Sequence, residues 1–107
     1  MNIISPSQLA ARLREPAPPQ LLDVREPEEL TIAALPGAYH IPLGELAERI
    51  EELEAKRHLD WVVVCHHGVR SAMATGFLSA NGFSRACNLS GGIDRWSLEV
   101  DPSVPRY

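Results

Sequence analysis

The sequence lacks the features that would tie the protein to a membrane or to nucleic acid. No apolar run approaches the length of a membrane-spanning helix, and the N-terminus has no basic-then-apolar secretory pattern. Basic residues are outnumbered by acidic ones, 10 to 14, which argues against nucleic acid or an anionic membrane as a partner. We therefore expect a cytoplasmic protein that binds neither nucleic acid nor membranes.

Cysteine is also scarce. The chain has two cysteines, Cys65 and Cys87, and no Cys-x-x-Cys pair, so free thiols are expected in a reducing compartment. Repeats and low-complexity segments are missing too, and 107 residues suffice for one hydrophobic core but not for two. The sequence predicts one domain over residues 1–100 and a C-terminal tail over residues 101–107.

Short apolar segments alternate with helical patterns along the chain. Strands are predicted at residues 2–4, 21–24, 39–41, 61–64 and 83–89, and helical segments at residues 6–15, 26–29, 43–57, 71–80 and 93–98. Strands that alternate with helices favour a parallel pairing. The expected fold class is α/β, with a central, mainly parallel sheet and helices on both faces.

The stretch from Trp61 to Ser71 is the best candidate for a reactive site. Four apolar residues predict a buried strand, Cys65 follows at its end, and a helix is expected from Ser71, with Met73, Phe77 and Leu78 on one face. Ligands of α/β sheets bind beyond the carboxyl ends of the strands. A helix N-terminus and the charge of Arg70 both favour a thiolate there. Cys87 has no such surroundings and is predicted to be structural.

Four segments, in order, resemble the single-domain rhodaneses, which are thiosulfate sulfurtransferases. They are Leu22–Glu29 (Asp-Val-Arg-Glu), Leu35–Leu43 (Pro-Gly-Ala and Ile-Pro), Cys65–Ser71 (Cys-x-x-Gly-x-Arg-Ser) and Leu89–Trp96 (Gly-Gly and Trp). Together they cover roughly residues 3 to 98. Two departures are Ala34, which stands where the family often has histidine, and the tail, which lies outside the shared region.

The resemblance implies a rhodanese-like fold and a cysteine persulfide on Cys65. The sulfur donor would be thiosulfate or another persulfide, and the acceptor a thiol or cyanide. The rest of the loop is expected to bind the substrate: His66, His67, Gly68, Val69 and Arg70. Gly68 lets the loop curl so that N–H groups face the sulfur, Arg70 neutralises sulfonate oxygens, and the two histidines add donors at the rim.

Further residues are expected to support this loop. Asp23 and Arg25, at the end of a predicted strand, are interpreted as braces for the loop, with Ser71 as a further supporting residue. Trp96 is expected to pack in the core or to border the pocket. No cofactor is expected, and two adjacent histidines without a further ligand cluster do not predict a metal site.

Two other functions remain open from the sequence. Dual-specificity phosphatases share the fold and use a cysteine loop that ends in arginine, but their loop is one residue longer than the four residues between Cys65 and Arg70. Non-catalytic rhodanese-like interaction modules have often lost the cysteine, which this chain retains.

Overall fold

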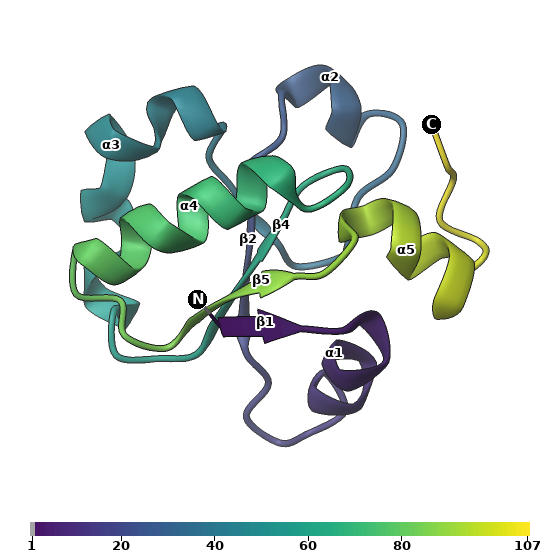
Figure 1. Ribbon diagram of the computed structural model, residues 1–107, viewed down its shortest axis with the longest axis horizontal. Helices are drawn as coiled ribbons and strands as arrows, with labels where there is room; N and C mark the ends of the chain where they lie inside the picture. Colours follow the sequence, from purple (N-terminus) through teal and green to yellow (C-terminus); the bar gives the residue numbers. More distant parts are fainter. Residues whose placement is uncertain (1) are drawn as a thin grey trace.

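A single parallel sheet organises the chain, and the computed structural model describes residues 2–107 of it. The five strands are β1 (Asn2–Ile4), β2 (Gln20–Asp23), β3 (Tyr39–His40), β4 (Trp61–Val64) and β5 (Ala86–Leu89), in the spatial order β1-β5-β4-β2-β3. Every pair of neighbouring strands is parallel. The predicted α/β fold class with a mainly parallel sheet is therefore confirmed (Figure 1).

Helical segments lie between the strands and after the last one. They are α1 (Pro6–Arg12), α2 (Pro27–Leu30), η1 (Leu43–Glu45), α3 (Leu46–Arg49), η2 (Ile50–Lys56), α4 (Val69–Ala80) and α5 (Gly92–Glu99), where η marks a 3-10 helix. A capping box opens α1: Ser5 Oγ accepts from the Gln8 N–H, and Gln8 Oε1 accepts from the Ser5 N–H. Within residues 2–107, none of these helices is long and apolar enough to cross a membrane.

The sheet separates two apolar layers because successive side chains of a strand point to opposite faces. Along β4, Trp61, Val63 and then Cys65 face the layer that contains Leu78 of α4 and Leu46 of α3. The opposite layer contains Val62 and Val64 with side chains of α1 and α5: Leu9, Ile93 and Trp96. Helices therefore cover both faces of the sheet, as predicted, and Cys65 lies on the α4 side.

Several predicted helix boundaries are wrong, and α1, for example, ends at Arg12 rather than at 15. The single helix expected over residues 43–57 is divided into η1, α3 and η2, because apolar spacing fixes the buried face of a helical segment but not whether its turns are α or 3-10. Helix α4 begins at Val69, two residues before the expected Ser71.

Two further predictions fail near α4. Met73 was expected on the apolar face but is largely exposed, because the buried stripe follows Ser71, Ala74, Thr75 and Leu78 instead. The last strand begins at Ala86 rather than at 83, because Phe83 ends α4 by donating its N–H to the Leu78 carbonyl and is buried as a core residue.

Candidate active site

The sulfur of Cys65 lies at the carboxyl edge of the central strand. The chain leaves β4 at Val64 and forms a loop before α4 begins at Val69; residues 65–70 are called the Cys65 loop. The Cys65 Sγ accepts the Gly68 backbone N–H at 3.0 Å, and the residue is only 1% exposed. An N–H group and the positive end of the α4 dipole thus lie beside the sulfur, an arrangement that stabilises an anion on it.

Gly68 gives the loop its shape. Its φ angle of +101° lies in the left-handed region, which side chains disfavour, and it serves as the N-cap of α4. A Cβ at this position would lie 3.3 Å from the Gly91 nitrogen, in the loop before α5. The predicted role of Gly68 in curling the loop fits this conformation.

Two polar side chains support the sulfur from within the protein. The Ser71 Oγ is 3.2 Å from the Cys65 Sγ and donates to the Asn88 Oδ1 at 2.5 Å. Asn88, on β5, also donates its Nδ2 to the Gly68 carbonyl at 3.2 Å. A serine hydroxyl has one proton to donate. While Ser71 donates it to Asn88, the Ser71 oxygen can accept a hydrogen bond from a Cys65 thiol. Beside a Cys65 thiolate, the same hydroxyl is placed to donate to the sulfur instead. The sequence did not indicate Asn88, because it lies 17 residues from Ser71 and meets it only through the pairing of β5 with β4.

Helix α5 fixes the other side of the loop. Its N–H groups at Ile93 and Asp94 donate to the carbonyls of Cys65 (2.9 Å) and His66 (3.1 Å). This approach requires glycine at position 92, where a Cβ would lie only 2.5 Å from the His66 carbonyl oxygen. The Gly-Gly segment thus lets the start of α5 dock on the Cys65 loop.

Arg70 is paired with a carboxylate from α2. Its two terminal nitrogens donate to Glu29 Oε1 at 2.6 Å and Oε2 at 3.0 Å. The Arg70 contact is the main cause that lowers the pKa of Glu29 to about 2, and the same contact raises the pKa of Arg70. Arg70, the residue predicted to bind a sulfonate, is therefore held by the Glu29 carboxylate in this structure. Glu29 is a site residue that the sequence did not indicate.

The two histidines differ in exposure. The His66 ring lies between those of His67 and Tyr107, with centroids 3.8 and 3.7 Å away. Its Nε2 is buried and finds no hydrogen-bond partner among residues 2–107. Burial, followed by repulsion from His67, lowers the pKa of His66. Of the predicted substrate-binding residues, His67 and Val69 are well exposed, whereas the His66 ring is covered.

Three potential metal ligands gather at this rim. One donor atom from each of His66, His67 and Asp94 lies within 4.8 Å of the others. The geometry suits a metal poorly, because the lone pairs of stacked imidazoles lie in separate, nearly parallel planes rather than converging. Asp94 is in addition held by Arg106, at 2.8 and 3.3 Å.

The expected braces are buried. Asp23 and Arg25 form an ion pair of 2.6 Å, and Arg25 also donates to the Ala33 carbonyl at 2.8 Å. The pair therefore braces the α2 segment, and through it Glu29. Trp96 packs in the core, so packing rather than the pocket is its role here. Cys87 is half-buried, and burial raises the pKa of its thiol.

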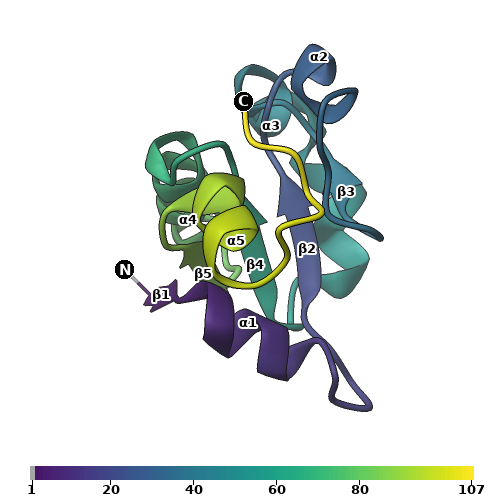
Figure 2. The same cartoon turned by 90° about the vertical axis from the view of Figure 1, so that its right-hand side faces the viewer.

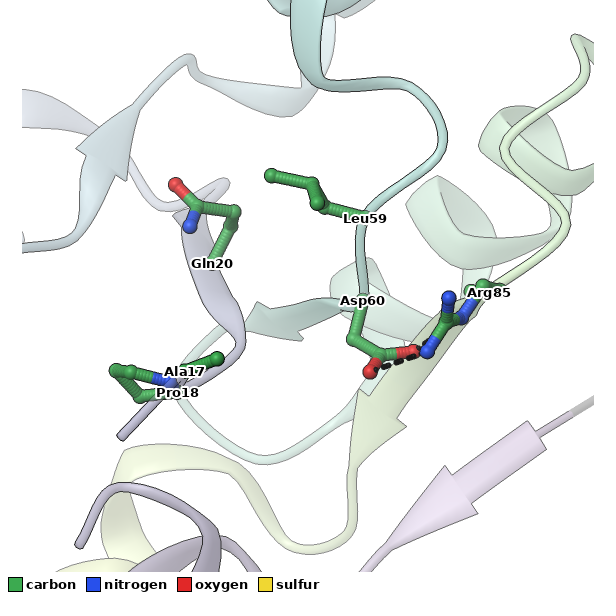
Figure 3. Close-up of a pocket in the computed structure, with 6 residues that line it drawn as sticks. All are labelled: Ala17, Pro18, Gln20, Leu59, Asp60 and Arg85. Atoms are coloured by element: carbon green, nitrogen blue, oxygen red, sulfur yellow. Dashed lines mark hydrogen bonds and ion pairs between the residues drawn. The ribbon is translucent and has the colours of Figure 1, made fainter. Parts of the chain in front are cut away.

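A separate hollow lies at the opposite, amino edge of the sheet (Figure 3). It has a volume of about 430 Å³ and is lined by Ala17, Pro18, Gln20, Leu59, Asp60 and Arg85. The Asp60 carboxylate is bound by Arg85 at 2.7 Å and Arg12 at 2.8 Å. With its charge paired, this hollow offers no nucleophile comparable to Cys65.

A model of the rhodanese-like domain matches residues 5–99. The chain belongs to the rhodanese-like family. A sulfurtransferase from Allochromatium vinosum is 33% identical over 97% of this chain and 95% of its own length. The structure of a rhodanese-related protein from Thermoplasma volcanium has a TM-score of 0.84 at 36% identity and covers 94% of both chains. The recognition of the family from four short segments is thus confirmed.

Some relatives are much longer. A rhodanese-like/PpiC domain-containing protein of Arabidopsis thaliana is 37% identical over 97% of this chain, which spans 36% of that protein's length. The matched rhodanese region ends at residue 99, and residues 101–107 lie outside it.

Proposed function

We propose that the chain is a sulfurtransferase that carries a sulfane sulfur on Cys65, from thiosulfate or another persulfide donor to a thiol or cyanide. The observation that supports this most is the position of the Cys65 Sγ, 3.0 Å from the Gly68 N–H at the start of α4. The Allochromatium vinosum sulfurtransferase, which matches over 95% of its own length, supports the same reaction class.

Two displacements make up the proposed reaction. The Cys65 thiolate attacks the outer sulfur of thiosulfate, the sulfur–sulfur bond breaks, and sulfite leaves with the electron pair. Cys65 then carries a persulfide anion, beside the Gly68 N–H and Ser71 Oγ. The acceptor attacks the outer sulfur of this persulfide; cyanide becomes thiocyanate, and the thiolate returns.

Arg70 is the proposed contact for the sulfonate of thiosulfate. It has to share its guanidinium with Glu29 or leave it, because both forked donors are occupied. This competition favours donors without a sulfonate, such as persulfides, over thiosulfate.

The phosphatase alternative requires a wider loop. A phosphoryl group needs donors for three oxygens as it transfers, whereas a sulfane sulfur is one atom. The four residues between Cys65 and Arg70 therefore favour sulfur transfer.

One preparation tests these alternatives together. We expect thiocyanate from thiosulfate and cyanide, loss of this activity in Cys65→Ser, and its retention in the control Cys87→Ser. The same preparation should hydrolyse aryl phosphates negligibly. Phosphate release that depends on Cys65, without thiocyanate formation, would mean that the protein is a phosphatase and not a sulfurtransferase. If neither thiocyanate nor phosphate formed, the result would favour the interaction module.

A further inference from the structure

The tail, residues 101–107, returns from α5 to the Cys65 loop. Figure 2 shows it leaving α5 and running along the molecule to end near α2, at the carboxyl edge of the sheet. Val104 packs against the core layer of α1 and α5, and Arg106 binds Asp94 of α5 through two hydrogen bonds. The segment outside the family match is thus attached along its length to the rhodanese domain.

Tyr107 completes this attachment on the site itself. Its ring stacks on His66, with centroids 3.7 Å apart and planes 6° from parallel. Its hydroxyl donates to Glu29 Oε2 at 2.6 Å and accepts from Arg25 Nη1 at 2.9 Å. Burial is the main reason that the pKa of Tyr107 rises to about 12, so the phenol is neutral and can donate at physiological pH.

Tyr107 thereby contacts His66 near the start of the Cys65 loop and Glu29, the partner of Arg70 at its end. His66 belongs to the loop, whereas Glu29 belongs to α2 and holds Arg70 at the far end of the loop. The same Oε2 of Glu29 accepts from Arg70 and from Tyr107. Cys65, which directly precedes His66, is almost completely buried.

We propose that Tyr107 is a specificity-determining residue, which narrows the access to Cys65 and so discriminates against bulky sulfur donors and acceptors. The inference rests on the proposed function of Cys65. A small reactant such as thiosulfate or cyanide should reach Cys65 with little displacement of the Tyr107 side chain. A bulky thiol has to move the Tyr107 ring off His66 and break its hydrogen bond to the Glu29 carboxylate.

Chemical modification of Cys65 measures this access without any sulfur transfer. Full-length wild-type protein and Tyr107→Ala are treated with iodoacetamide, a small reagent, and with fluorescein maleimide, a large one, and peptide mapping follows the modification of Cys65. The lost hydrogen bond to a charged group corresponds to about a tenfold change or more. We expect Tyr107→Ala to raise the maleimide rate by about that factor and the iodoacetamide rate much less.

Two variants make the comparison specific. Tyr107→Phe keeps the stacking ring but loses both hydrogen bonds, so it should lie between wild type and Tyr107→Ala; it also carries the test if the alanine variant folds poorly. Tyr39→Ala is the matched control, since Tyr39 is a similarly exposed tyrosine whose hydroxyl binds Glu52 instead. It should leave both rates unchanged.

The outcomes separate the two proposals. An unchanged ratio of the two rates in Tyr107→Ala and Tyr107→Phe would overturn the role of Tyr107, even in a protein that transfers sulfur. A changed ratio in a protein that forms no persulfide would support the role of Tyr107 in access and overturn the proposed reaction. Where both hold, Tyr107→Ala should also increase transfer to glutathione relative to cyanide.

Discussion

Arg70, at the end of the Cys65 loop, donates through both terminal nitrogens to the carboxylate of Glu29 on α2. The pair joins the end of the loop to α2. It also neutralises the charge that a sulfonate would use, so Glu29 and an anionic donor compete for the same guanidinium.

This competition predicts opposite effects for the two partners. Arg70→Ala should lower kcat/KM for thiosulfate by about 10- to 150-fold, since a charge-assisted contact contributes about 1.5–3 kcal/mol. Glu29→Gln should lower the KM for thiosulfate, because it removes a negative charge beside the sulfonate. Steady-state kinetics with thiosulfate and with an uncharged persulfide donor measure both effects. Equal losses in both variants, with both donors, would mean that the pair only holds the loop in place.

The Glu29 carboxylate also predicts how stability depends on pH. Its pKa falls from 4.5 to about 2 in the folded protein, chiefly because Arg70 donates to it. A lowered carboxyl pKa stabilises the folded state above the unfolded value, and this contribution is lost as the pH falls from about 4.5 towards 2. Urea unfolding of wild type and Glu29→Gln should therefore show a gap in the free energy of unfolding that narrows between about pH 6 and pH 3. A gap that stays constant would contradict the ion pair.

Gly92 offers a test of how α5 holds the loop. A left-handed backbone conformation costs a residue other than glycine about 1–2 kcal/mol. Gly92→Ala should lower the free energy of unfolding by more than this, because the added Cβ would clash with the His66 carbonyl. Gly37→Ala is the matched control, with a φ of +79° and nothing within 4 Å of the added Cβ. Thermal unfolding should rank Gly92→Ala as the less stable variant, and only Gly92→Ala should lose sulfur transfer. If both variants had similar thermal stability and sulfur-transfer activity, the close approach of Gly92 to the His66 carbonyl would not be what requires glycine at this position.

Ser71 allows the support of the sulfur to be tested separately. Ser71→Ala leaves the buried Asn88 Oδ1 without its donor and should destabilise the protein by about 1–3 kcal/mol. It should also slow persulfide formation, because the thiolate loses a potential hydroxyl donor. Thr75→Ala removes another buried hydroxyl of α4, which donates to the Ser71 carbonyl and not to the sulfur. We expect Thr75→Ala to lose stability with little change in the rate of persulfide formation; equal rates in both variants would limit Ser71 to a structural role.

The sequence predicts this site as far as its parts are local. The end of β4, Cys65, Gly68 and Arg70 are close together in the chain, so the predicted order of strand, loop and helix places Cys65 correctly at the end of β4. The partners come from distant positions: Glu29 lies 41 residues from Arg70, and Tyr107 lies 78 residues from Glu29. Neither periodicity nor spacing signals such contacts, because they depend on how the strands order in the sheet.

The helix boundaries failed for a different reason. Apolar spacing shows which residues face the core but not the type of helical turn, and so residues 43–57 were expected as one helix. Helix α4 begins at Val69, two residues before the expected start, because Gly68 adopts a left-handed conformation as its N-cap. Side-chain patterns do not show this backbone conformation.

Persulfide formation on Cys65 tests the central claim most directly. After treatment of the wild-type protein with thiosulfate, intact-mass spectrometry should show the addition of one sulfur atom, about 32 Da, and peptide mapping should place it on Cys65. Cyanide should then remove it. Sulfur found on Cys87, or on neither cysteine, would contradict the assignment of Cys65 as the sulfur carrier.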